Sequence, residues 1–221
     1  MGAYREIDDL ISNGYEIRIG DYFSRGWEIF SGYIGEFIGY FLIYGIIIFA
    51  LNFVPIIGGI AGIVIAGPLL AGFFIVAFKR MQNQAAEFGD FFLGFNRFLP
   101  FFLVNLVTGL FVGLGFILLI IPGIYLAVSY TFALPLIVDR DLDFWQAMEA
   151  SRKVVTRDWF NVFVLVLLLF LLNLAGAIVL LIGLIFTVPF TYCITAAAYE
   201  DIFGLEGPAA AVEAGGGTKE N

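Results

Sequence analysis

Long apolar runs alternate with short polar stretches along the whole chain. Crossing a bilayer as a helix takes about 20 apolar residues. Six runs reach or approach this length, at residues 33–54, 56–78, 100–121, 123–138, 159–181 and 182–199. Short breaks divide successive pairs, at Pro55 with Gly58 and Gly59, at Pro122 with Gly123, and at Gly183. The pattern predicts an all-α integral membrane protein with six transmembrane helices arranged as three hairpins.

A shorter amphipathic stretch precedes each hairpin, near residues 20–31, 87–98 and 142–155. Each stretch contains an Asp followed by two aromatic residues: "DYF" from residue 21, "DFF" from residue 90 and "DFW" from residue 143. An Asp can cap a helix N-terminus, and aromatic rings suit the headgroup depth of a membrane. We therefore predict three interfacial helices, and a unit of one helix and one hairpin repeated three times.

These units form a single expected transmembrane domain over residues 1–206. The tail over residues 207–221 is small and polar, which predicts disorder. The first 30 residues carry charges throughout and lack the compact apolar core of a secretory signal peptide.

Composition and charge placement support a membrane location. The chain is 61% hydrophobic and 14% charged, with a mean hydropathy of +0.97, whereas soluble domains are about a quarter charged. All 11 Lys and Arg residues fall on one side of the predicted hairpins, and the three opposite turns are uncharged. By the positive-inside rule, the charged side is cytoplasmic. We expect a multi-pass protein of the bacterial inner membrane with both termini in the cytoplasm.

Residues suited to catalysis or metal binding are scarce. The chain has no His and one Cys, Cys193, so Ser–His and Cys–His pairs and Cys/His zinc sites are excluded. Asp139, Asp141 and Asp143 cluster after the fourth run, but their spacing fits no EF-hand, and a solvated turn is the favoured interpretation. We predict no enzymatic activity, no catalytic or metal-binding residue and no cofactor.

Polar residues within the apolar runs are the remaining candidates for a site. Foremost are Glu36, Asn52, Asn105 and Asn173. Asn residues in membrane helices most often bridge helices by hydrogen bonds; the sharper alternative is the coordination site of a transporter. Glu36 lies about one turn into the first run, where its side chain can reach the cytoplasmic interface.

The stretch "LLIIPGIYLAVSYTFALPLIVDRDLDFWQAMEASRKVV" resembles a family of uncharacterised bacterial polytopic membrane proteins. The similar features are Pro122-Gly123-Ile124-Tyr125, Phe132-Ala133 with Pro135, an acidic turn, and Ala147, Ala150 and Ser151 before a basic pair. The family is similar to the membrane domain attached to some glycerophosphodiester phosphodiesterases. The resemblance covers about residues 85–205 and implies a helical membrane domain. It implies no phosphodiesterase activity, because that domain is absent from this chain.

Without a catalytic constellation, the leading hypothesis is a non-enzymatic accessory, scaffold or assembly subunit that binds a larger membrane complex or organises lipid around it. Its partners would be membrane lipids and a protein, and no feature indicates nucleic acid. Trp27, Phe91, Trp145 and Met148 on the interfacial helices are the predicted residues for partner or membrane docking. The alternative is a small-solute transporter or a lipid-moving membrane protein. A polar cavity at mid-membrane depth favours the alternative, whereas a solid apolar core favours the first hypothesis.

The charge pattern makes the topology testable. A Cys placed at Gln84 should react only with reagents on the cytoplasmic side, and a Cys at Gly123 should react from outside, because every basic residue lies on the side of Gln84. Thiol labelling in intact cells and in inverted vesicles measures this, with the native Cys193 as the background. Labelling of Gln84 from outside would contradict the three-hairpin arrangement.

Overall fold

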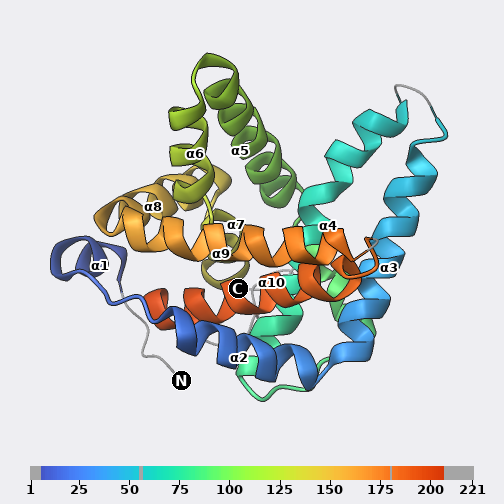
Figure 1. Ribbon diagram of the computed structural model, residues 1–221, viewed down its shortest axis with the longest axis horizontal. Coiled ribbons are helices and arrows are strands. Elements are labelled where there is room, and N and C mark those ends of the chain that lie inside the picture. The colour runs from blue at the N-terminus through green and yellow to red at the C-terminus, as the bar shows by residue number, and fades with distance from the viewer. Residues whose placement is uncertain (1–5, 55–56, 180, 207–221) are drawn as a thin grey trace, which may run out of the picture.

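The computed structural model describes residues 6–54, 57–179 and 181–206, and the regular structure within them is helical (Figure 1). In chain order the helices are α1 (Ile7–Asn13), α2 (Ile19–Ser31), α3 (Ile34–Leu51), α4 (Ile57–Met81), the 3₁₀ helix η1 (Phe88–Arg97), α5 (Phe98–Leu118), α6 (Ile120–Ser129), α7 (Ala133–Arg140), α8 (Phe144–Arg157), α9 (Trp159–Ile178) and α10 (Leu184–Phe203). The all-α prediction is confirmed. The predicted disordered tail and the predicted break at Pro55 lie outside the described residues.

In the part of the chain that the structure describes, five segments are long and apolar enough to cross a membrane, as is typical of a multi-pass membrane protein. They are Ile34–Leu51, Gly58–Met81, Phe88–Leu118, Ile120–Arg140 and Trp159–Ile178. The sixth predicted span corresponds to α10, which is not among the five. Its Thr and Tyr residues and its terminal Glu200 and Asp201 lower its hydropathy. The buried residues of α10 include every position from Cys193 to Glu200, so this helix belongs to the protein core.

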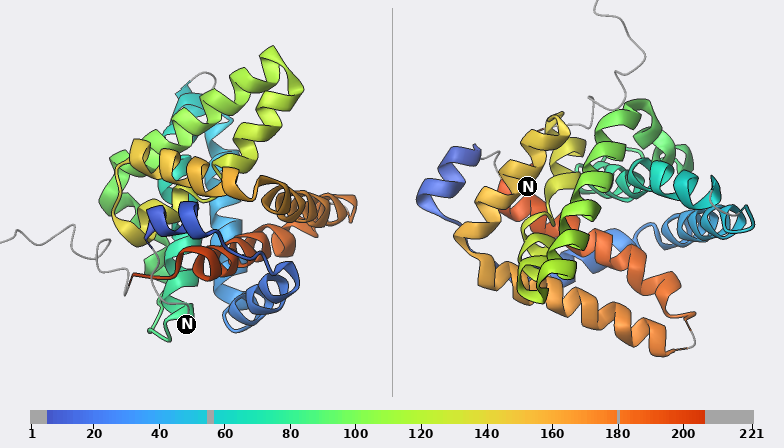
Figure 2. Two further views of the ribbon diagram at one scale, coloured as in Figure 1. Left: turned by 90° about the vertical axis from the view of Figure 1, so that its left-hand side faces the viewer. Right: turned by 90° about the horizontal axis from the view of Figure 1, so that it is seen from above.

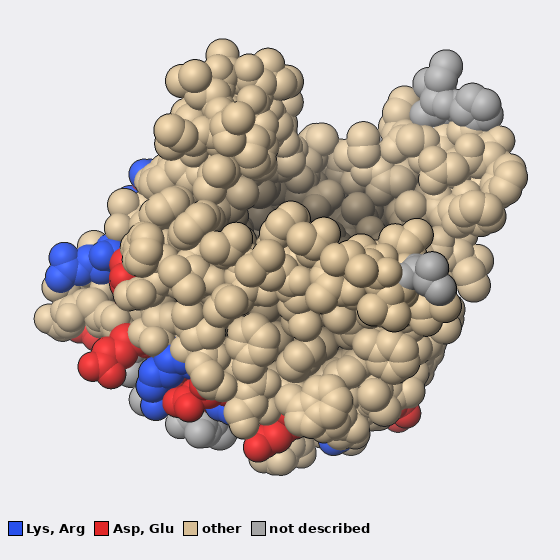
Figure 3. Space-filling view, viewed as in Figure 1, with Lys and Arg blue, Asp and Glu red and all other residues tan. Residues whose placement is uncertain are grey.

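Three helical hairpins, α3–α4, α5–α6 and α9–α10, diverge from one another. Figures 1 and 2 show α9 running at a steep angle to the α5–α6 hairpin, while the α3–α4 hairpin projects separately. In Figure 3 the described parts of the projecting tips of the α3–α4 and α5–α6 hairpins show no charged residue, and the charges in this view gather toward the opposite end of the molecule. We call this end, formed by α1, α2, η1, α8 and the adjoining ends of α4, α7 and α10, the charged face. The three stretches that precede the hairpins are helical: they form α2, η1 and α8, and these helices lie on the charged face.

Each of these three helices packs mainly against the hairpin of a different unit. The most extensive contacts of α2 are with α10, those of η1 are with α4, and those of α8 include α7. The contacted helices α10, α4 and α7 belong to the second half of the third, first and second hairpin, respectively. The three units therefore form a closed ring of contacts: the first unit contacts the third, the second contacts the first, and the third contacts the second. The ring converts three local hairpins into one folded body.

Two glycines allow close contact in this ring. A Cβ atom on Gly26 of α2 would lie 2.8 Å from the Ile194 Cα atom of α10, and a Cβ on Gly94 of η1 would lie 2.2 Å from the Pro68 carbonyl oxygen of α4. Both distances are too short for any side chain. Small residues bring helix backbones together in this way in membrane proteins.

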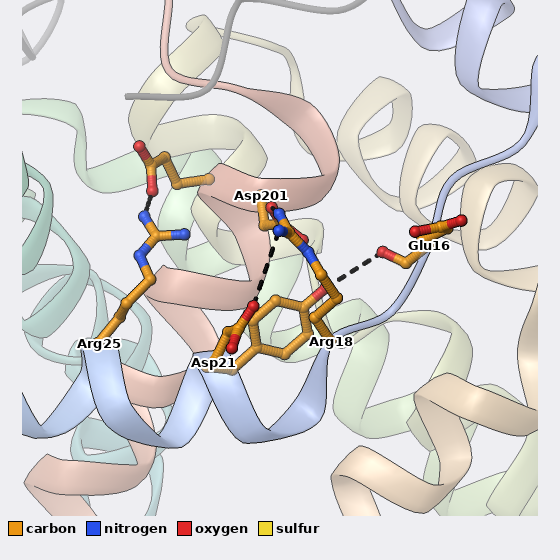
Figure 4. Close-up of polar contacts among 7 residues, drawn as sticks. Glu16, Arg18, Asp21, Arg25 and Asp201 are labelled. Carbon is orange, nitrogen blue, oxygen red and sulfur yellow. Dashed lines mark hydrogen bonds and ion pairs between the residues drawn. The ribbon is translucent and has the colours of Figure 1, made fainter.

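Ion pairs reinforce the same junctions at the charged face. Lys79 of α4 pairs with Asp90 of η1 at 3.2 Å between Nζ and Oδ1, and both side chains are largely buried. At the equivalent junction Arg25 of α2, labelled in Figure 4, pairs with the buried Glu200 of α10. Lys79 and Glu200 each lie eleven residues after a proline within their helix, at Pro68 and Pro189. The first and third units thus match at these positions, and the three-unit repeat stays a prediction.

The junction of α2 and α10 holds a further polar network. Arg18, at the start of α2, pairs with Asp201 and lies 3.6 Å from Asp21 (Figure 4). The Tyr22 hydroxyl donates to Asp201 Oδ2 at 2.8 Å. Burial raises the pKa of Tyr22, so its hydroxyl keeps the proton that it donates. Asp21 therefore acts in this network and does not cap its helix.

The acidic cluster after α7 separates into three different contacts. Asp139 is buried and accepts from the Tyr199 hydroxyl at 2.7 Å. Asp141 pairs with Arg97 of η1. Asp143 caps α8 by accepting from the Trp145 backbone N–H at 3.2 Å. Asp139 and Asp141 thus join α7 and its C-terminal end to α10 and to η1, whereas Asp143 acts within α8. The solvated-turn interpretation is wrong for Asp139, whose side chain is buried.

The second hairpin turns earlier than its sequence suggests. Residue Leu119 alone separates α5 from α6, and Pro122 falls in the first turn of α6. Proline is tolerated there because first-turn N–H groups lack helical partners. A Cβ on Gly123 would lie 2.5 Å from the Phe116 ring, so Ile121, 80% exposed at the same tip, is the less crowded position for the thiol labelling proposed above.

The predicted fourth span is broken into α6 and α7 at residues 130–132. Pro135 cannot donate a backbone hydrogen bond, and its ring crowds the carbonyl group four residues earlier, at Thr131. Ser151 of α8 meets the break: its hydroxyl donates to the Ser129 carbonyl at 2.7 Å and accepts from the Phe132 N–H at 3.2 Å. A side chain from the charged face thus satisfies backbone groups that lipid cannot.

The buried ion pair between α4 and η1 should contribute measurably to stability. We expect Lys79→Met to lower the free energy of unfolding by about 3 kcal/mol, because breaking a buried pair leaves the Asp90 carboxylate without its cation. Thermal unfolding in detergent measures the change. Lys153→Met is the matched control, since Lys153 is exposed and pairs only within α8. Equal shifts for the two variants would contradict a structural role for the pair.

Candidate functional site

A cavity of about 400 Å³ lies where the diverging hairpins meet. Its walls come from α4, α5, the break between α6 and α7, α9 and α10. Figure 3 shows the surface hollowed between the projecting α3–α4 and α5–α6 hairpins. The cavity therefore opens toward the uncharged part of the molecule and away from the charged face.

Apolar side chains line most of the cavity, and neutral polar groups interrupt them. The apolar lining includes Leu70 and Phe74 of α4 and Val166, Leu169 and Phe170 of α9. The polar lining consists of Asn105, Thr108, Tyr130, Thr131, Asn173, Thr191, Tyr192 and Thr195. None of the described residues that line the cavity is charged. Ligand sites commonly combine an apolar wall with a few fixed polar groups in this way.

The structure brings together two of the four polar residues predicted within the membrane. Asn105 and Asn173 lie on α5 and α9 and both line the cavity. Glu36 lies half-buried in the first turn of α3, and Asn52 is exposed at the far end of that helix, where its amide donates to the Ile48 carbonyl at 2.7 Å. Neither lines the cavity.

Asn173 is held by a short chain of hydrogen bonds between α9 and α10. Its side-chain amide donates to the Thr191 hydroxyl at 2.8 Å and to the Leu169 carbonyl at 3.0 Å. The Thr191 hydroxyl donates in turn to the Thr187 carbonyl at 2.8 Å. Hydrogen bonds of this kind contribute about 0.6–2 kcal/mol between membrane helices. Asn173 thus bridges α9 and α10, as predicted for an Asn within an apolar run, and also lines the cavity.

Thr108 and Thr195 join the site without having been singled out from the sequence. Thr108 lies three residues after the predicted Asn105, and Thr195 lies four residues after Thr191, so each shares a helix face with another polar residue of the cavity. This three- or four-residue spacing is the sequence feature from which the two threonines could have been predicted.

The four residues predicted for docking divide into two pairs. Trp27 and Trp145 are each 53% exposed, on α2 and α8. Phe91 is fully buried and stacks on Tyr40 with ring centroids 4.4 Å apart, and Met148 is also buried. Only the two tryptophans are therefore positioned to meet a partner or the membrane.

The described residues offer little for bond-making chemistry. Among residues 6–54, 57–179 and 181–206, no three His, Cys, Asp or Glu side chains gather closely enough to hold a metal ion. Cys193 is buried in α10. The cavity can therefore supply shape, apolar surface and neutral hydrogen-bonding groups.

Comparisons with protein-family models, with curated proteins and with solved structures found no match. The resemblance to the uncharacterised bacterial membrane proteins stays a prediction, and the function is argued from this chain alone.

Proposed function

We propose that this protein is a non-enzymatic, multi-pass membrane protein that binds a membrane lipid between its hairpins and thereby organises or moves that lipid. The observation that carries this proposal is the cavity at the meeting point of the hairpins. Its volume of about 400 Å³ lies within the usual range of about 300–1,000 Å³ for ligand sites.

The surroundings of the cavity favour a lipid over a water-soluble solute. The hairpins that flank it expose large apolar side chains, including Phe53, Ile117 and Ile178, each more than 70% exposed. Such surfaces are stable only in contact with hydrocarbon. Acyl chains would therefore surround and enter the space between the hairpins. A transporter coupled to ions or protons usually needs an ionisable residue at depth, and none of the described lining residues supplies one.

The proposed topology places six segments in the bacterial inner membrane as three hairpins that enter from the cytoplasm, with α10 as the sixth. The absence of charge from the described parts of the hairpin tips and the gathering of charge at the other end support this orientation. The charged face would then lie at the cytoplasmic surface, with α2, η1 and α8 as its interfacial helices.

Filling the cavity should release the lipid. We expect Leu134→Trp, which adds bulk to the cavity wall, to lower the amount of lipid that co-purifies in mild detergent by at least severalfold, because overfilled sites exclude their ligands. Quantitative lipid mass spectrometry measures the bound lipid per protein. The matched control is Leu118→Trp, since Leu118 is 75% exposed at the hairpin tip. Equal lipid content in both variants and in the unchanged protein would refute a lipid site in the cavity.

A second candidate function is that of an accessory, scaffold or assembly subunit of a membrane complex. The observation in its favour is the exposure of Trp27 and Trp145 on the charged face, because large aromatic residues are enriched where proteins dock. Lipid binding and this role are compatible, since a scaffold can also organise lipid around its complex.

Docking through the two tryptophans has its own test. We expect Trp27→Asp combined with Trp145→Asp to abolish co-purification of a specific protein partner while the helices still insert, because the backbone hydrogen bonds of each span are internal. Quantitative proteomics after gentle purification measures the partner. Trp159→Phe serves as a control, because Trp159 stacks within the protein against Phe163. A partner retained by the double variant would leave these helices as membrane anchors only.

A further inference from the structure

We propose that the cavity selects a lipid whose head is uncharged and carries a hydroxyl group. This inference rests on the proposed lipid-binding function and specifies the chemical class of the ligand. Three properties of the cavity lead to it: the absence of charge from its described lining, the fixed orientation of the Asn173 amide, and the direction of the threonine hydrogen bonds.

The uncharged lining disfavours the heads of ordinary phospholipids. A phosphate buried without Arg, Lys or several N–H donors loses its hydration without replacement, which costs several kcal/mol. The described lining residues include no Arg or Lys to receive it. An ammonium head has the same difficulty, because no carboxylate lines the cavity within the described residues. The part of the ligand inside the cavity is therefore neutral.

The hydrogen bonds around Asn173 fix which way its amide points. The Thr191 hydroxyl uses its one proton on the Thr187 carbonyl, so it can only accept from Asn173. The amide nitrogen of Asn173 must therefore face Thr191, as it does at 2.8 Å. Its Oδ1 atom is buried and has no hydrogen-bond partner among the described residues. Because Asn173 lines the cavity, a ligand group that reached Oδ1 would supply the missing donor.

The threonines add to this preference. Thr195 donates its proton to the Thr191 carbonyl at 2.9 Å, which leaves only lone pairs for a ligand. The Thr108 hydroxyl is buried without a partner among the described residues and is able to donate or accept. A buried polar group without a partner costs about 1–3 kcal/mol, so a ligand that supplies the missing bonds is favoured. A hydroxyl group is neutral, donates to Asn173 and accepts from Thr108.

Three photoreactive probes with one acyl chain separate the contributions of charge and of donated hydrogen bonds. Each carries a diazirine in an 18-carbon chain, attached as a monoacylglycerol, as a methyl ester or as the free carboxylate. The full chain in bilayers is irradiated with each probe, and labelled peptides covering residues 166–173 of α9 are quantified by mass spectrometry. We expect the monoacylglycerol to label these peptides about three to ten times more than the methyl ester, the ratio expected for one hydrogen bond, and more than the carboxylate.

Substitutions assign the preference to the lining residues. Asn173→Leu should bring the ratio of monoacylglycerol to methyl ester labelling close to one. Thr195→Val is the gentler second variant, because its hydroxyl bonds only to the backbone of its own helix, and it should lower the ratio in part. Thr156→Val is the matched control: Thr156 likewise donates to a carbonyl four residues earlier, at Arg152, but lies on α8 outside the cavity.

The outcomes distinguish this inference from the function on which it rests. Equal labelling of the α9 peptides by all three probes would overturn the selection of a hydroxyl head and leave lipid binding in place. Stronger labelling by the carboxylate would overturn the neutral head. No labelling of these peptides by any probe would overturn the lipid-binding function itself.

Discussion

Hydrocarbon offers neither solvation for charge nor hydrogen-bond partners for the backbone, and the arrangement of this protein follows from that constraint. The described residues in the outer parts of the hairpins are helical and uncharged, and the charged residues lie at one end. Where Pro135 breaks a helix, Ser151 from α8 supplies the missing hydrogen bonds. A surface helix therefore does more than lie on a membrane, because its side chain forms hydrogen bonds with backbone groups of the apolar segment that it contacts.

The ring of contacts at the charged face holds the hairpins together. Hydrocarbon is as apolar as the side chains of the hairpins, so burying those side chains gives little driving force for association within a membrane. Close backbone contacts at Gly26 and Gly94 and the ion pairs of Lys79 and Glu200 act where each surface helix meets a neighbouring unit. Since these contacts lie at one end, the hairpins can diverge at the other, and the divergence leaves room for a cavity.

Local structure could be predicted from the sequence, but the association of distant segments could not. The repeated Asp–aromatic pattern located α2, η1 and α8, because amphipathic spacing is a property of a few consecutive turns. The core position of α10 escaped prediction, since its burial depends on contacts with α2 and α4, which are distant in the sequence. Asn105 and Asn173 were identified as polar residues within apolar runs. Their meeting in one cavity depends on how hairpins of different units diverge, which the spacing along the chain does not encode.

The place where the repeat fails is also the place where the cavity forms. Pro68 and Pro189 lie within continuous helices, whereas the helix at Pro135 is interrupted over residues 130–132. Tyr130 and Thr131 of this interruption line the cavity, together with Ala133 and Leu134. Departures from local regularity in an otherwise consistent fold tend to mark functional sites, because a break costs stability that the fold alone does not require. Here the chain retains both the break and the Ser151 side chain that stabilises it. The interruption thus supplies an uncharged, partly polar part of the cavity wall, at the level where the hairpins separate. A lipid with an uncharged head would bind against this wall.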